Sequence, residues 1–258
     1  MSFRRVSWQR VRGRLIFSLL LAALVFPAAR LEGNWEQLLV IKERAGVDWR
    51  QYPVTIGIPV PRGEPGLTSP PRLFDPWGRE LPVQAKSAGV WPGEEGPRWW
   101  LLTFLASVNR KGSARYRLVS GDRAAPAPAS SLVIEETAGG LSVDTGTILL
   151  ELKADKPIFH QLWFDPSGRR NYQDENRVLV PGGDELALRI GDEIFRAQWA
   201  APAVIILEEE GPIKAVIKLQ GRLCDLEGKG DFTYTCRIEA YAGAPYLQVD
   251  LTLTAGGR

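Results

Sequence analysis

Hydrophobic and polar residues alternate with a period of two along most of the chain. The clearest stretch is residues 246–254, where four apolar side chains share one face: Leu247, Val249, Leu251 and Leu253. Successive side chains of a β-strand point to opposite faces, so this pattern predicts strands with one face on a core and one in water. Helical periodicity is almost absent beyond the N-terminal segment. The pattern therefore predicts an all-β, antiparallel protein.

The predicted strands form two blocks, separated at residues 121–131 by a small, polar, proline-bearing stretch that is typical of a linker. In the block at 36–120 they cover 40–43, 54–58, 73–83 (strand, turn, strand), 99–104 and 114–119. In the block at 132–258 they cover 132–135, 141–145, 147–153, 158–164, 186–190, 203–207, 213–219, 232–241 and 246–254. Two β-domains are expected, the second a β-sandwich. The chain stops just after its last strand, which indicates either a continuing sequence or an edge strand.

Residues 1–29 differ from the rest of the chain. They carry five Arg and no acidic residue, and residues 15–26 form an apolar run. A basic segment followed by about a dozen apolar residues predicts a secretory signal peptide. The run would span about 18 Å as a helix, well short of a membrane core. Phe26 and Pro27 fit a cleavage site poorly, so an uncleaved N-terminal anchor stays open. We expect an exported protein, periplasmic or secreted, that meets a membrane only through this segment.

Charge and composition exclude several classes of function. Without residues 1–29 the chain has 27 Lys and Arg against 30 Asp and Glu, with no basic stripe, which removes the main electrostatic support for nucleic-acid binding. One His and two Cys cannot form a His/Cys metal cluster, and no metal or cofactor is predicted. Nucleophile-elbow, P-loop and zinc-protease motifs are also missing from the sequence. Adjacent acids on a strand point to opposite faces, so the acidic pairs form no ready catalytic pair.

The two cysteines lie on either side of a glycine-rich turn. Cys224 and Cys236 flank residues 227–231, each in a strand-like run. In an oxidising compartment this arrangement is compatible with a cross-strand disulfide. Against it, Cys224 is out of phase with Ile217 and Leu219 on its own strand. Both readings stay open at this stage.

Aromatic residues cluster in the first block. Within 24 residues the sequence places four Trp beside two Arg: Trp77, Trp91, Trp99, Trp100, Arg79 and Arg98. Flat rings can stack on sugar faces, and Arg binds carboxylates in a bidentate manner, so these residues are candidates for binding an acidic polysaccharide. The alternative is that the Trp side chains are core material. Because Trp99 and Trp100 are adjacent, at most one of them can share a face with Leu101.

Two sets of stretches resemble a known family. The first set is VTIGIPVPRG at 54–63, LFDPWGRELPVQ at 73–84 and WPGEEGPRW at 91–99. The second set is EEGPIKAV at 209–216, Gly221 and RIEAYAG at 237–243. In this order they resemble the exo-rhamnogalacturonan lyase (PcRGLX/YetA-like) family. One departure is the family's W-P-D-G-S stretch, which is altered here after Trp91-Pro92.

The resemblance implies a RIFT-type β-barrel at 36–120 and the start of the family's central sandwich at 132–258. It also implies rhamnogalacturonan as the substrate class and β-elimination as the reaction. Family members continue into a large α/α-toroid domain that these residues do not contain. The resemblance therefore implies the N-terminal portion of an exported lyase-like protein, not catalytic alone, which needs that C-terminal domain or a partner chain. No catalytic residue can be assigned.

Two other functions stay open. The chain could be a non-catalytic carbohydrate-binding or scaffold β-module. It could also be a self-sufficient enzyme that uses Arg, Lys, Tyr and His160 in a cleft between the barrel and the sandwich.

Overall fold

The computed structural model describes residues 35–62, 67–93, 96–121, 125–129, 132–155, 158–179 and 186–256. In these ranges the chain forms seventeen strands and only short 3₁₀ turns, and every strand pairing is antiparallel. The expectation of an all-β protein is confirmed. No helix in the described ranges is long and apolar enough to cross a membrane. The predicted signal peptide or anchor at 1–29 lies outside the described residues.

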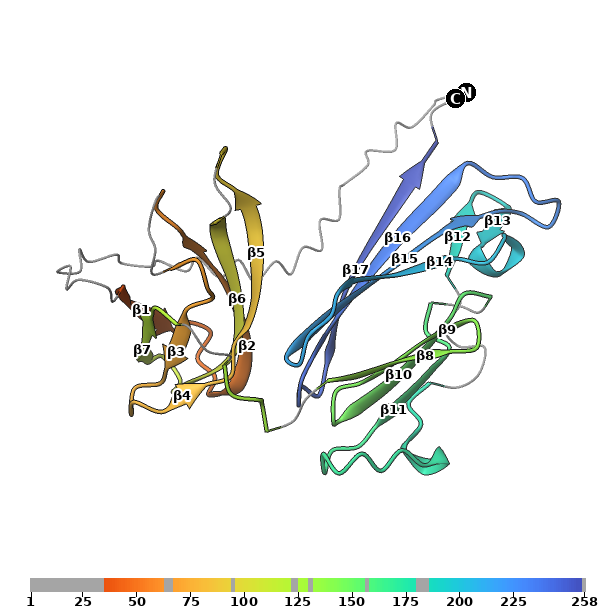
Figure 1. Cartoon of the computed structure of the whole chain (residues 1–258). Helices are drawn as coiled ribbons and strands as arrows, with labels where there is room; N and C mark the ends of the chain where they lie inside the picture. The colour runs from red at the N-terminus through yellow and green to blue at the C-terminus, as the bar shows by residue number, and fades with distance from the viewer. Residues whose placement is uncertain are drawn as a thin grey trace, which may run out of the picture.

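Strands β1 to β7 form the N-terminal domain, on the left of Figure 1. Their bounds are Glu36–Lys42 (β1), Trp49–Pro59 (β2), Arg72–Phe74 (β3), Glu80–Leu81 (β4), Gln84–Val90 (β5), Pro97–Val108 (β6) and Ser113–Val119 (β7). They make one sheet in the order β1-β7-β3-β4 and a second in the order β2-β6-β5. The two sheets enclose one hydrophobic core, in which Phe104 and Tyr116 are among the largest buried side chains.

Strands β8 to β17 form the C-terminal domain, on the right of Figure 1. Their bounds are Val133–Thr137 (β8), Gly140–Asp144 (β9), Ile148–Lys153 (β10), Gln161–Phe164 (β11), Ala187–Ile190 (β12), Glu193–Arg196 (β13), Val204–Glu209 (β14), Lys214–Leu223 (β15), Phe232–Tyr241 (β16) and Leu247–Ala255 (β17). The 3₁₀ turns η2 and η3 cover Asp174–Asn176 and Ala197–Trp199.

The core of the C-terminal domain lies between two four-stranded sheets. Their strand orders are β11-β10-β9-β8 and β14-β15-β16-β17, and β12 and β13 form a separate hairpin. Both sheets contribute alternate apolar side chains, such as Leu150 and Ile217, to one buried cluster. This face-to-face packing of two antiparallel sheets is a β-sandwich arrangement.

Strand β17 lies at an edge of its sheet and buries its apolar face only in part. The alternation predicted by the sequence is present, and the apolar side chains share the sheet face that carries Ile238 and Cys236. However, Val249, Leu251 and Leu253 stay 44%, 43% and 45% exposed. The pattern correctly identified the strand, but alternation does not tell how far the opposing sheet extends over it.

Three tight turns in the fold are held by the same pattern of hydrogen bonds to an Asp carboxylate. Each has the sequence Asp-x-x-Gly followed by a basic residue, beginning at Asp75, Asp165 and Asp225. In each turn the Asp carboxylate accepts backbone N–H groups from the residues two and four positions later. The glycine at the fourth position has a positive φ, which residues with a side chain rarely adopt. At Asp165 the hydroxyl of Ser167 also donates a hydrogen bond, and these bonds lower the pKa of Asp165 to about 2.

The side chain of Gln84 on β5 joins the two domains. Its Oε1 accepts the N–H groups of Ile213 and Lys214 at 3.0 and 2.8 Å. Its Nε2 donates to the carbonyl of Lys214 at 3.0 Å and to a carboxylate oxygen of Glu209 at 2.8 Å. Gly211 lies so close that a Cβ there would overlap the Gln84 amide. The amide thus saturates its hydrogen bonds within the turn between β14 and β15.

Of the two readings of the cysteine pair, the structure has the one without a bridge, because Cys224 and Cys236 are both free, buried thiols. The hairpin of β15 and β16 pairs Cys236 with Leu219. Cys224 lies five residues beyond Leu219, about 17 Å along an extended strand. A disulfide needs Cα atoms within about 7 Å, so the register separates the two thiols too far. Burial raises the pKa of Cys236 to about 11, which keeps its thiol protonated at neutral pH.

Replacing Gly211 with Ala should destabilise the protein by about 1–3 kcal/mol, because the new methyl group overlaps the Gln84 side chain. Gln84→Ala alone should cost about 2 kcal/mol, since it leaves two buried N–H groups without their acceptor. In the Gln84→Ala background the methyl group has room, so Gly211→Ala should cost only a few tenths of a kcal/mol. Urea unfolding of the four proteins gives this double-mutant cycle.

The control for the cycle is Gln220→Ala, which removes an exposed Gln from β15. It should change the free energy of unfolding by less than about 0.5 kcal/mol. Equal costs of Gly211→Ala with and without Gln84 would contradict the packing described here.

Unfolding in denaturant without a reductant should expose two thiols per chain to a disulfide reagent such as 5,5′-dithiobis(2-nitrobenzoate). In the folded protein neither thiol should react rapidly, because both are buried and the reactive form is the thiolate. Release of fewer than two thiols from freshly unfolded protein would show that the pair is oxidised.

Candidate functional site

The turn between β3 and β4 holds two of the six residues predicted to bind carbohydrate. Asp75 is buried at its base, where its carboxylate accepts the N–H groups of Trp77 and Arg79, both at 2.9 Å. The same carboxylate binds the Arg79 guanidinium at 3.0 Å. Trp77 is directed outward and is 79% exposed, and the Arg79 side chain is 74% exposed. The turn therefore exposes an indole ring and a guanidinium two residues apart, above the buried Asp75 that holds the turn.

Trp77 and Arg79 line a pocket of about 330 Å³, which we call the Trp77–Arg79 pocket. Its lining comes from the β3–β4 turn, from β2, β6 and β7, and from the segment between the domains: Gln51, Asp75, Trp77, Arg79, Glu80, Leu81, Pro82, Leu105, Ser107, Tyr116 and residues 126–129. The volume lies at the lower end of the range for small-ligand pockets.

The acidic side chains and the tyrosine that line this pocket are already engaged with the protein. The Tyr116 hydroxyl donates to the carbonyl of Ser107 at 3.0 Å and accepts the Ser107 N–H at 2.9 Å, and burial raises the pKa of Tyr116. Glu80 forms a bidentate ion pair with Arg72 at 2.8 and 2.7 Å. These contacts fix the pocket wall and occupy its acids. The arrangement is suited to holding a ligand rather than to moving a proton.

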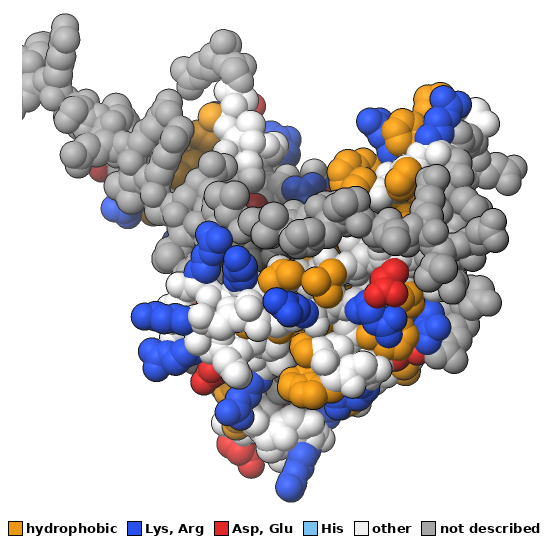
Figure 2. All heavy atoms as spheres, turned by 90° about the vertical axis from the view of Figure 1, so that its left-hand side faces the viewer, with side chains coloured by type: hydrophobic (Ala, Val, Ile, Leu, Met, Phe, Trp, Pro, Cys, Tyr) orange, Lys and Arg blue, Asp and Glu red, His pale blue; other side chains and the backbone are white. Residues whose placement is uncertain are grey.

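The N-terminal domain that carries this pocket is basic. Residues 35–121 contain twelve Lys and Arg against eight Asp and Glu. Figure 2 shows one face of this domain, where Lys and Arg side chains are spread widely and acidic side chains are few. Within the domain Arg72 and Arg117 both lie over the ring of Phe74, at 5.0 and 4.8 Å from its centroid. A basic domain attracts anionic ligands over a range of about 10 Å at ordinary ionic strength.

Three more of the predicted residues lie elsewhere in the same domain. The indole N–H of Trp91 donates to the carbonyl of Val60 at 3.0 Å, and the Arg98 guanidinium lies over the Trp91 ring at 4.9 Å. Trp99 is 41% exposed on the outer face of β6, where its ring lies against Gly57. None of the three lines the Trp77–Arg79 pocket. The sequence cluster is therefore divided in space.

Trp100 requires a correction, because it is not available to a sugar. It points into the core of the N-terminal domain and is 8% exposed, and its indole N–H donates to the carbonyl of Leu67 at 2.9 Å. The period-two argument anticipated that Trp99 and Trp100 face opposite sides, but it could not tell which side is the core. The register of β6 with β2 places Trp100 beside Ile58 on the inner face.

Sequence reasoning missed several residues of the pocket. Residues 126–129 were expected only as linker, yet they form part of the wall. Gln51 reaches the pocket from an irregularity in β2, where its own φ is +52° and its N–H donates to the Ser107 hydroxyl at 3.2 Å. Neither residue type nor spacing signals these roles in the sequence. Among the described residues, no group of three His, Cys, Asp or Glu side chains could hold a metal ion.

Comparison with known proteins identifies the family of this chain neither by sequence nor by structure. No family model matches the chain, and no curated protein sequence matches it. A solved alpha-mannosidase from Enterococcus faecalis V583 is similar to it with 13% sequence identity and a TM-score of 0.49, covering 87% of this chain and 30% of that protein. A glycosyl hydrolase family 38 protein from Enterococcus faecalis has 14% identity and a TM-score of 0.49, with 86% and 31% covered. The chain thus spans about a third of the length of these two proteins.

Proposed function

We propose that this chain is the carbohydrate-binding portion of an exported rhamnogalacturonan lyase-like protein and that it holds an acidic polysaccharide at the Trp77–Arg79 pocket. The observation that carries the proposal is the pairing of a 79% exposed Trp77 with a 74% exposed Arg79 on one rigid turn. Exposure of a large aromatic ring to water is unfavourable. Contact with the apolar face of a sugar ring removes that surface from water and so favours binding. The neighbouring guanidinium binds the carboxylate of a uronate.

The chemistry of rhamnogalacturonan matches both groups. Its backbone alternates a neutral rhamnose with a negatively charged galacturonate, so one residue can stack while the next forms an ion pair. Arg79 already binds Asp75 through one edge of its guanidinium, which leaves the opposite edge for a ligand. The basic character of the N-terminal domain supports the same choice of an anionic chain.

The pocket supports binding rather than cleavage by this chain alone. β-Elimination needs a base that removes a proton and an acid that protonates the departing oxygen. Among the described residues that line the pocket, Asp75, Glu80 and Tyr116 are the candidates for acid or base, and each is held by partners within the protein. The elimination is therefore assigned to groups outside this pocket.

A scaffold function is the second candidate, and the domain junction favours it. The stretch that ends at Gln84 and the stretch at 209–216 both belong to the resemblance, and they contact each other across the junction. A role in holding two β-domains in one orientation would account for these two stretches without any ligand.

The binding proposal is tested with oligosaccharides of rhamnogalacturonan I and with the same oligosaccharides after reduction of their carboxyl groups. Isothermal titration calorimetry should show saturable binding of the acidic form and weaker binding of the reduced form. Trp77→Ala should weaken binding about three- to tenfold, the loss of one aromatic contact. Arg79→Gln should weaken only the acidic form, about three- to fivefold. No absorbance of unsaturated uronate should develop.

The matched controls are Arg189→Gln, an exposed Arg on β12, and Trp99→Ala on the outer face of β6. Neither should change the affinity. If Trp99→Ala abolishes binding while Trp77→Ala leaves it intact, the site has been placed wrongly. A rise in unsaturated-uronate absorbance with this chain alone would show that it is itself the lyase.

A further inference from the structure

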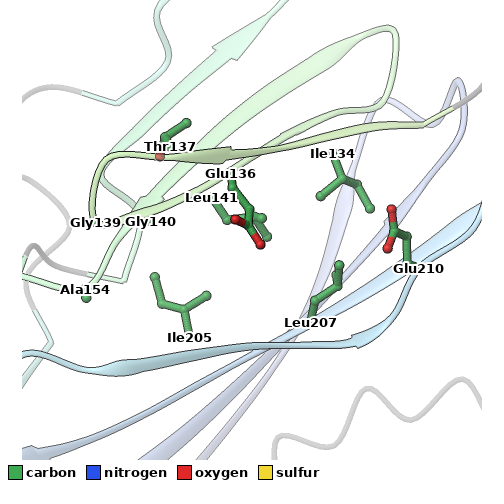
Figure 3. A pocket seen from close by; sticks show the side chains of 10 residues that line it. All are labelled: Ile134, Glu136, Thr137, Gly139, Gly140, Leu141, Ala154, Ile205, Leu207 and Glu210. Atoms are coloured by element: carbon green, nitrogen blue, oxygen red, sulfur yellow. The ribbon is translucent and has the colours of Figure 1, made fainter.

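A second cavity, of about 520 Å³, lies in the C-terminal domain at the open edge of the sandwich. Figure 3 shows it between strand β8 on one side and strand β14 on the other. These two strands are the edge strands of the two facing sheets. Ten residues line the cavity: Ile134, Glu136, Thr137, Gly139, Gly140, Leu141, Ala154, Ile205, Leu207 and Glu210.

Backbone hydrogen bonds connect the two walls on either side of the cavity. On one side the N–H of Leu132 donates to the carbonyl of Pro212 at 3.1 Å. On the other side the N–H of Ala203 donates to the carbonyl of Ala154 at 2.7 Å. Between these two contacts the sheets separate. The space is therefore bounded along the edge and fits a compact molecule better than an extended peptide running through it.

The interior of the cavity is aliphatic. Ile134 comes from β8, and Ile205 and Leu207 come from β14, with their side chains directed toward one another across the space in Figure 3. All three pack against the buried cluster of the C-terminal domain, to which Leu141 belongs. A ligand that covers them gains roughly 25 cal/mol per Å² of apolar surface removed from water.

Two carboxylates stand at the cavity, one from each wall. Glu136 belongs to β8, and Glu210 directly follows β14. Both side chains are exposed, and neither makes an ion pair or hydrogen bond with another described residue. Among the described residues, no Lys or Arg lines the cavity. The carboxylates therefore retain their capacity to bind a cation.

The C-terminal domain around the cavity is itself negatively charged. Residues 122–258 contain fourteen Lys and Arg against 21 Asp and Glu, the opposite balance to the N-terminal domain. An anionic sugar would be repelled here, and the residues that line the cavity include no aromatic ring for a neutral sugar to stack on. The Trp77–Arg79 pocket differs in having an indole ring and a guanidinium in its lining.

We propose that this cavity binds a compact organic cation, an amine that carries an aliphatic or single-ring body. The apolar body would lie against Ile134, Ile205 and Leu207, and the ammonium group would bind Glu136 and Glu210. This site is independent of the carbohydrate site, because the two cavities share no residue.

The test uses cyclohexylmethylamine as the probe and cyclohexylmethanol as its neutral counterpart of the same shape. Both are titrated into the purified protein with methyl-labelled Ile and Leu, and the methyl resonances are followed by NMR. The amine should shift the methyl signals of Ile134, Ile205 and Leu207 in a saturable manner and bind at least threefold more tightly than the alcohol. Raising the salt concentration should reduce the affinity of the amine and leave that of the alcohol unchanged.

Variants that remove one carboxylate at a time test which residues bind the ammonium group. Glu136→Gln and Glu210→Gln should each weaken amine binding about three- to fivefold, the contribution of one exposed ion pair. The matched control is Glu135→Gln, because Glu135 is the exposed neighbour of Glu136 and points to the opposite face of β8. All three positions are exposed, so the variants should fold like the parent protein.

Equal affinity for the amine and the alcohol would overturn the proposal, because the carboxylates would then contribute nothing. Saturating shifts confined to methyl groups outside the cavity would also overturn it. If Glu135→Gln weakens amine binding as much as Glu136→Gln does, the amine is attracted by the overall negative charge of the domain. That result would also refute the site.

Discussion

One amide side chain makes four hydrogen bonds across the junction of the two domains. Gln84 is supplied by the N-terminal domain, and its amide binds the backbone at Ile213 and Lys214 and the carboxylate of Glu209 in the C-terminal domain. A buried amide is costly unless its donors and acceptors are satisfied, so this geometry is favourable only when the domains meet in this orientation. Gly211 permits the approach because it has no side chain.

Further contacts connect the junction to strands β15 and β16 of the C-terminal domain. Lys214 is buried and binds Glu239 at 3.0 Å, and the Tyr241 hydroxyl donates to the same carboxylate at 2.6 Å. Burial, reinforced by the Glu239 carboxylate, raises the pKa of Tyr241 well above its ordinary value. The Lys214 and Glu239 side chains are 11% and 27% exposed, and a partly buried ion pair of this kind need not add net stability. The start of β15 is thus tied both to the neighbouring domain and to β16.

The fold also separates two chemistries that the overall charge conceals. The N-terminal domain is basic and presents an indole ring with a guanidinium, whereas the C-terminal domain is acidic and has an aliphatic cavity with two carboxylates. Calculated over the whole chain these charges nearly cancel. The proposed ligands of the two sites are accordingly opposite in charge, an acidic polysaccharide and a compact amine.

Period-two alternation by itself determined that this protein is all-β, and it located nearly all the strands. The reason is that successive side chains of a strand face opposite sides of the sheet, of which one is buried. The alternation missed the whole of β5, with its small and polar residues, and the short strand β13. The turn at Asp75 was also predictable from local chemistry. Only the tertiary structure decided that Trp77 is exposed while Trp100 is core, that Cys224 and Cys236 are apart, and that β8 and β14 border a cavity. Each of these depends on strand register and on which sheets face each other, and these follow from contacts between residues distant in sequence.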